Sequence, residues 1–258
     1  MIESYLYLLV TIIGLIIGSF LNTLIFRLPI TQGIITHKDE IHIYHPRSFC
    51  PNCNKMIPFY FNIPLLSFIL LKGRCFFCSH KISFTYPFVE LLNASFYLIF
   101  YLLYGLSYEF IFYSLVTSLL IPISFIDLKF RIIPNSLILF ILLLGIFFSF
   151  VNPYLSVFNS IAGAVMGFLI FYLMSSIYLI LKKEEGLGVG DAKLLAAVGS
   201  FVGIYNIPII IFITSIVGLV SGLVFYVTED KKEKFLKTSI PLAPSISLSF
   251  LLFFLFIS

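Results

Sequence analysis

The stretch YLYLLVTIIGLIIGSFLNTLIF, residues 5–26, decides the fold class, because it carries no charged side chain over a length that crosses a bilayer. A transmembrane helix needs about 20 consecutive apolar residues. The only charged side chain ahead of this run is Glu3, so the run lacks the basic flank of a secretory signal peptide. We therefore predict that it is retained as a first transmembrane helix.

The rest of the chain repeats this pattern. Of its 258 residues, 60% are hydrophobic and 11% are charged, and the mean hydropathy is +1.09. A soluble domain carries about 25% charged residues, so this chain cannot cover itself with polar surface. We predict an all-α polytopic membrane protein with about eight transmembrane helices, in the runs 5–26, 87–106, 108–126, 132–151, 155–181, 192–204, 207–227 and 240–257. The run 192–204 is short, and a shallow or re-entrant helix is its alternative.

The basic residues indicate the topology. All sixteen Lys and Arg fall in five places, at 27–81, 129–131, 182–183, 193 and 231–237. With eight spans these places share one side, and the opposite connections near 105–108, 152–154 and 205–206 contain neither residue. Because cytoplasmic loops are enriched in Lys and Arg, we predict an outside N-terminus and cytoplasmic basic loops. The net charge of +4 then reflects topology and contact with anionic membrane lipid, and it does not point to nucleic acid.

Residues 27–86 form a long polar insert, which divides the chain into a first helix (1–26), the insert and a helical bundle (87–258). The insert holds the pairs CPNC (50–53) and CFFC (75–78), which contain all four cysteines. Two C-x-x-C pairs about twenty residues apart have zinc-ribbon spacing. The alternative, disulfides, needs an oxidising compartment, whereas the topology places the insert in the cytosol. We predict a small zinc-ribbon-like cytoplasmic insert with structural zinc on Cys50, Cys53, Cys75 and Cys78, because four thiolates leave no open catalytic position.

Two carboxylates lie at the cytoplasmic ends of apolar runs. Asp127 ends the run 108–126 in SFIDLKFRIIPN, and Asp191 precedes the run 192–204 in GLGVGDAK. Acids at the edge of a span are functional candidates by default. If the two meet, they can share a proton, so that one activates water while the other polarises a peptide carbonyl, as in aspartic proteases. The alternatives are a helix cap at Asp191 and an interfacial ion pair at Asp127.

Glycines surround the second aspartate. Gly186, Gly188 and Gly190 precede it, and Lys193 follows it. Glycine adopts backbone conformations closed to other residues, and its missing side chain leaves room for a substrate backbone. Asp191 would then open a helix, where the positive end of the helix dipole suits its charge. We predict that these glycines and Lys193 form an active-site loop around the aspartate.

Together these motifs resemble those of the type IV prepilin leader peptidases, which are membrane aspartic proteases of the GxGD kind. The resemblance covers nearly the whole chain, through GSFLNTLIFRLP (18–29), HPRSFCPNC (45–53), FNIPLLSFILLKGRCFFC (61–78), ISFTYPFVELL (82–92), IDLKFRIIPN (126–135) and GLGVGDAKLLAAVGSFVG (186–203). The segment IPLAPS (240–245) is similar to a family P-x-G-P segment, but Ala243 replaces its glycine.

The resemblance implies an activity. Family members cut the basic leader from prepilins or pseudopilins of type IV pilus and type II secretion systems, at the cytoplasmic face of the bacterial inner membrane. Bifunctional members, whose cysteine-bearing insert is similar to this one, then methylate the new N-terminus with S-adenosylmethionine. The polar residues of the family-like segments that become methyltransferase candidates are Asn22, Arg27, Asn62, Lys72, Arg74 and Glu90. Their structural alternatives include a turn at Asn62 and a snorkelling anchor at Arg27.

Other classes of function remain open at this stage. Paired membrane carboxylates and glycine-broken helices also mark proton- or cation-coupled transporters. The predicted position of both aspartates at the membrane rim, and not at its midplane, argues against transport. A non-catalytic scaffold with a zinc loop would leave the GxGD pattern unexplained. The sequence does not predict an oligomeric state.

Overall fold

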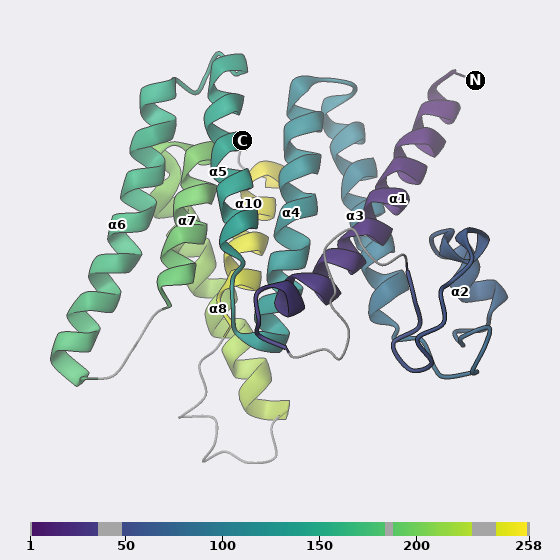
Figure 1. Cartoon of the computed structure of the whole chain (residues 1–258). Coiled ribbons are helices and arrows are strands. Elements are labelled where there is room, and N and C mark those ends of the chain that lie inside the picture. Colours follow the sequence, from purple (N-terminus) through teal and green to yellow (C-terminus); the bar gives the residue numbers. More distant parts are fainter. Residues whose placement is uncertain (1, 36–47, 184–187, 229–240, 257–258) are drawn as a thin grey trace. The chain divides into compact units, whose positions relative to one another are not determined.

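The structure is a computed structural model that describes residues 2–35, 48–183, 188–228 and 241–256 (Figure 1). Its long helices are α1 (Ile2–Thr31), α3 (Thr85–Tyr104), α4 (Tyr108–Phe130), α5 (Asn135–Val151), α6 (Val157–Lys182), α7 (Val189–Val202), α8 (Ile207–Thr228) and α10 (Ala243–Phe256). A short helix α2 (Leu66–Leu70) and the 3₁₀ turns η1 (Phe59–Asn62) and η2 (Ile204–Asn206) complete them. These described segments contain no strand, so the prediction of an all-α polytopic membrane protein is confirmed.

The helices differ in how much of a bilayer they can cross. Within the described residues, five are long and apolar enough to span, over Glu3–Thr31, Thr85–Tyr104, Tyr108–Phe130, Val157–Lys182 and Ile204–Val224, and α5 and α10 are shorter apolar helices. α7 has 14 residues. A helix of that length rises about 21 Å, which is less than the roughly 30 Å of a hydrocarbon core. The predicted run 192–204 is therefore a short helix, as α10 with its 14 residues is, and its crossing of the membrane stays a prediction.

Packing divides the chain into two units, residues 1–122 and 123–258, with the boundary inside α4. In the first unit α1 packs along α3. Gly14 and Gly18 lie one turn apart on α1, and a Cβ on either would come 2.7 Å from the Cα of Ala94 or Glu90, respectively. Small residues at this spacing let two membrane helices approach to backbone contact. The division at residues 26 and 86 inferred from sequence stays a prediction.

In the second unit α7 packs against α6 and α5, and α6 lies beside it in Figure 1. Glycines of α5, α6 and α7 make this close packing possible. A Cβ on Gly163 of α6 would collide with the carbonyl oxygen of Gly199, and one on Gly145 of α5 would collide with the Ser200 side chain. The Ser160 hydroxyl of α6 also donates to the Ser200 carbonyl oxygen at 2.7 Å. α7, which carries Asp191, is thus held at backbone contact from two sides.

This packing makes a stability prediction. We expect Gly163→Ala to lower the free energy of unfolding by about 1–3 kcal/mol, because the added methyl group meets backbone that cannot move cheaply. Gly218→Ala on α8 is the matched control, since its Cβ would lie 3.8 Å from Leu242 and Ser245, in ordinary contact. The measurement is the thermal unfolding midpoint in detergent. Equal midpoints for the two variants would contradict the packing argument.

Candidate active site and metal centre

The two aspartates belong to the same unit and lie at helix ends. Asp127 sits in the last turn of α4 with 5% of its surface exposed, and Asp191 sits half-buried in the first turn of α7. Burial and the negative charge of Asp127 raise the pKa of the Asp191 carboxyl to about 7, against an opposing hydrogen bond from the Gly188 backbone. The structure therefore brings the two carboxylates within electrostatic reach of one another.

Asp127 has partners that its sequence motif does not show. Its Oδ2 accepts a hydrogen bond from the backbone N–H of Ala243, at 3.1 Å, where α10 begins. Arg131, just beyond the end of α4, adds a positive charge that acts on the same carboxylate. One turn earlier on α4, the Ser124 hydroxyl donates to the Ser247 hydroxyl at 2.9 Å. These contacts place the end of α4 beside the start of α10.

The glycines of the second motif have packing roles in the structure. Gly188 has φ −68° and ψ 138°, a conformation open to any residue, so the expectation of an unusual backbone there is wrong. A Cβ on Gly188 would lie 3.0 Å from Oδ2 of Asp191, and one on Gly190 would lie 3.3 Å from Cβ of Ile133. Both positions therefore leave room for neighbours from the protein itself. Gly186 lies outside the described residues.

Lys193 connects the second motif to the first. It lies on α7, one half-turn beyond Asp191, and its Nζ donates to Oδ1 of Asn135 at 3.0 Å. Asn135 is the first residue of α5 and follows the IIP segment of the first aspartate motif. This bond, together with the contact between Gly190 and Ile133, packs the first turn of α7 against the segment that follows Asp127.

The four cysteines converge. The Sγ atoms of Cys50, Cys53, Cys75 and Cys78 all lie within 4.8 Å of one another, and those of Cys50 and Cys78 are 3.8 Å apart. A tetrahedron with Zn–S bonds of about 2.3 Å has edges of roughly 3.8 Å, so the cluster has the size that a metal ion requires. All four are free thiols, which does not fit the disulfide alternative. The cluster could therefore hold a metal ion.

The two pairs also share one backbone design. The N–H of Cys50 donates to the Lys55 carbonyl at 3.0 Å, and that of Cys75 donates to the His80 carbonyl at 2.8 Å, five residues on in each pair. The residue after each second cysteine has positive φ, 53° at Asn54 and 56° at Ser79. Each pair is also flanked by an isolated bridge, Phe49 with Met56 and Arg74 with Lys81. Two equivalent turns therefore aim two thiols each at one point.

Hydrogen bonds favour the thiolate form of one of these cysteines, Cys78. The backbone N–H of His80 and the side chain of Asn52, whose Nδ2 lies 3.6 Å from Sγ of Cys78, lower the pKa of the Cys78 thiol to about 6. Burial acts in the opposite direction on Cys50 and raises its thiol pKa to about 11. A thiolate is the form that binds metal, so these hydrogen bonds favour the metal-binding form of Cys78.

Three of the methyltransferase candidates are buried on α1 and α3. Asn22 and Glu90 are 6% and 7% exposed, and Arg27 is buried near the end of α1. Nδ2 of Asn22 donates to the Tyr86 carbonyl of α3 at 3.0 Å, one turn before Glu90. Oε2 of Glu90 accepts from the N–H of Leu65 at 2.8 Å, and Leu65 has φ 58°, a strained value for a residue with a side chain. Glu90 therefore anchors a strained turn of the insert to α3.

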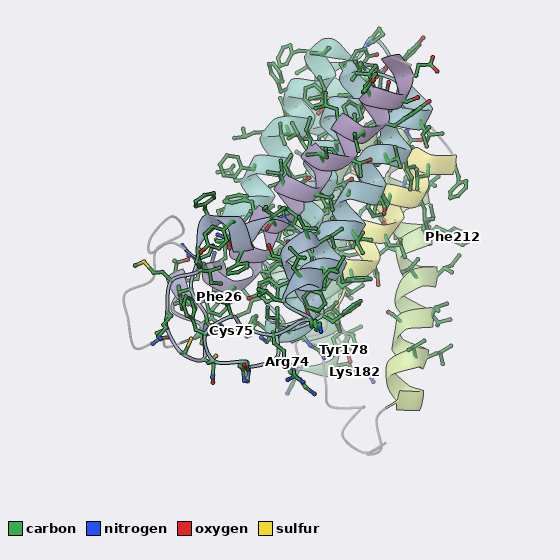
Figure 2. The ribbon with its side chains drawn as sticks, turned by 90° about the vertical axis from the view of Figure 1, so that its right-hand side faces the viewer. Phe26, Arg74, Cys75, Tyr178, Lys182 and Phe212 are labelled. Carbon is green, nitrogen blue, oxygen red and sulfur yellow. The ribbon has the colours of Figure 1, made fainter. Side chains whose placement is uncertain are left out.

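The other three candidates lie on the surface of the insert. Asn62 ends η1 and is exposed, and Lys72 and Arg74 are exposed on either side of Gly73. Arg74 immediately precedes Cys75, and both are labelled on the insert in Figure 2. The six residues thus form a buried set on α1 and α3 and an exposed set on the insert. Their part in methyl transfer stays a prediction.

The protein is a polytopic membrane protein whose helices carry two interacting aspartates at their ends, and the same chain contains a four-cysteine cluster. An interacting pair of acids is the arrangement that suits peptide hydrolysis. Comparison with known proteins gives the family. The description "Bacterial Peptidase A24 N-terminal domain" matches residues 12–104, and "Type IV leader peptidase family" matches residues 114–223. The chain belongs to the type IV leader peptidase family, which confirms the resemblance found from its motifs.

Curated relatives match over most of their length. The chain is similar to the prepilin leader peptidase/N-methyltransferase of Vibrio cholerae, with 35% identity over 97% of each chain. It is 33% identical to the protein of that name from Neisseria gonorrhoeae, over 88% of this chain and 85% of the relative. It is 36% identical to the type 4 prepilin-like proteins leader peptide-processing enzyme of Escherichia coli, over 93% of this chain and 90% of the relative. No solved structure matches the chain. The transporter alternative finds no support among these relatives.

Proposed function

We propose that this protein cleaves the leader peptide of type IV prepilins or pseudopilins and then methylates the new N-terminus. The observation that carries the peptidase is the interacting pair of Asp127 and Asp191 in a chain of this family. Relatives at 33–35% identity carry names for both activities. The particular pilin substrate, and the pilus or secretion system that it serves, are not defined by these residues.

The pair acts on a peptide bond at the membrane surface. A carboxylate takes a proton from water as the water oxygen attacks the scissile carbonyl, and a protonated carboxyl donates to the carbonyl oxygen. In the predicted topology the basic loops are cytoplasmic and the N-terminus is outside, which would put the site on the cytoplasmic side of the bacterial inner membrane. A prepilin whose apolar helix lies in the bilayer presents its leader junction at that depth. Gly188, Gly190 and Lys193 shape the loop and the first turn around Asp191.

The insert supports this function through its cluster. Cys50, Cys53, Cys75 and Cys78 would hold zinc as a structural ion, because a complete thiolate set fixes the two turns to each other. S-adenosylmethionine would supply the methyl group, carried on a positively charged sulfur. Glu90 and Asn62 would supply the carboxylate and the amide that suit a cationic group and an amine. The other candidates are Asn22 and Arg27, which are buried, and Lys72 and Arg74, which are exposed.

The test of the peptidase is cleavage by the purified full chain in detergent, with a prepilin as substrate. We expect a product shortened at the leader junction and a kcat/KM that falls as pH rises through about 7, because one carboxyl of the pair must hold a proton and the raised pKa of the pair, at Asp191, lies near that value. Mass spectrometry of the product, with and without S-adenosylmethionine, then reports methylation. An intact prepilin at every pH would refute the peptidase.

A further inference from the structure

We propose that the backbone N–H of Ala243 is the third element of the aspartate site, and that it makes Asp127 the base towards water and Asp191 the acid towards the substrate carbonyl. This inference rests on the proposed peptidase function and goes beyond it, because an interacting pair alone does not say which carboxyl does which. Ala243 is a positioning residue, since its N–H touches Asp127 and not the substrate.

At the start of α10, the backbone N–H of Ala243 is available to bind the Asp127 carboxylate. The first backbone N–H groups of a helix have no partner within the helix. Pro244, the second residue of α10, has no N–H, and the N–H of Ala243 donates to Oδ2 of Asp127 at 3.1 Å. Ala243 is fully buried and Asp127 is 5% exposed, so this bond lies largely out of bulk solvent. The positive end of the helix dipole adds to the attraction for a negative charge.

A second contact fixes the register of the two helices. Ser124 lies three residues before Asp127 on α4, and Ser247 lies four residues after Ala243 on α10. Their hydroxyls are 2.9 Å apart. Two bonds a helical turn apart prevent α10 from sliding along α4, so the amide stays aimed at the carboxylate.

The charges around the pair are unequal. Burial disfavours the charged form of both carboxyls, so their partners decide between them. Asp127 faces the Ala243 N–H, the positive charge of Arg131 and the negative charge of Asp191. Asp191 faces the negative charge of Asp127 and one backbone hydrogen bond from Gly188. When two carboxyls share one proton, the one with more donors and cations around it keeps the negative charge. The shared proton therefore resides on Asp191.

The reaction balances with this assignment. The Asp127 carboxylate takes a proton from water, the water oxygen bonds to the carbonyl carbon, and Asp191 gives its proton to the carbonyl oxygen, which forms a diol. Asp127 then gives its proton to the leaving nitrogen as the carbon–nitrogen bond breaks. Asp191 takes a proton from one diol hydroxyl as the carbonyl re-forms. The products are a carboxylic acid and an amine, and both aspartates return to their starting states.

The direct test removes the N–H. Ala243→Pro deletes it at the first position of a helix, where proline is tolerated. We expect the acidic limb of the pH profile of kcat/KM to move upward by about one pH unit, because the Asp127 carboxylate loses a donor that favours its charged form. Ala243→Gly keeps the N–H and is the matched control, with the wild-type limb expected. A structural role alone would lower the rate without moving the limb.

A second set of variants decides the matter if the proline variant does not fold. Arg131→Gln removes the cation beside Asp127 and should move the same limb in the same direction, and Arg131→Lys should restore it. Lys129→Gln, which removes an exposed cation two residues away on the same helix end, should leave the limb in place. If the wild type cleaves prepilin and the acidic limb of the pH profile does not move in any folded Ala243→Pro or Arg131→Gln variant, the assignment is overturned. No cleavage by the wild type would instead overturn the peptidase function, and this inference with it.

Discussion

Replacing either Asp127 or Asp191 by asparagine is expected to lower kcat/KM for leader cleavage by about 10³-fold or more. General acid and base catalysis each contribute about 10²- to 10⁴-fold, and asparagine can neither take a proton from water nor donate one to a carbonyl. Because the pair shares one proton, we expect the double variant to be no slower than the slower single variant. The measurement is the initial rate of prepilin shortening by detergent-purified protein.

The control for this prediction is an acid on the same helix as Asp127. Glu109 lies in the first turn of α4, and Asp127 lies in its last turn. Glu109→Gln should leave the cleavage rate near that of the wild type. The thermal unfolding midpoints of the asparagine variants show whether the fold survives, as we expect from a change that keeps size and shape. Near-normal cleavage by either asparagine variant would remove that aspartate from the mechanism.

The encounter of the two aspartates could be predicted from sequence, and the third element of their site could not. Charge placement predicts that Asp127 and Asp191 lie at one membrane face, and helix ends at one face of a bundle can meet. The partner of Asp127, however, is a backbone N–H, which any residue but proline could supply. The segment IPLAPS departs from the family pattern at Ala243, yet nothing in its letters indicates that the N–H of this residue would reach Asp127.

The glycines show a similar limit. A glycine in sequence indicates either a backbone conformation closed to other residues or the need for space, and the letter does not distinguish the two. At Gly188 and Gly190 the missing side chain leaves space, for the Asp191 carboxylate and for Ile133 respectively. At Gly203 the backbone conformation requires glycine, since α7 ends there with a φ of 74°. The predicted run 192–204 therefore becomes a helix that starts earlier, at Val189, and stops at this glycine.

The cysteine cluster gives the second large prediction. We expect Cys75→Ser to abolish stoichiometric metal binding and to unfold the cysteine turn at residues 75–78, because a structural zinc site contributes about 10–16 kcal/mol of apparent binding free energy to such a fold. The expected loss of methylation exceeds the loss of cleavage. The cluster and the anchor Glu90 belong to residues 1–122, whereas both aspartates belong to residues 123–258. The measurements are metal content per chain, cleavage rate and methylation rate on one preparation.

Phe76→Ser is the matched control for that variant, because it introduces the same residue at the next position without removing a ligand. The Phe76 side chain is 60% exposed, so we expect this variant to keep both its metal and its methylation. Purification under reducing conditions separates metal ligation from disulfide formation. A reduced wild-type protein without stoichiometric metal would refute the zinc site. Equal loss of cleavage and methylation in Cys75→Ser would mean that the peptidase also needs the ordered insert. A structural ion affects every reaction that depends on the segment it orders, and here both reactions would depend on the insert.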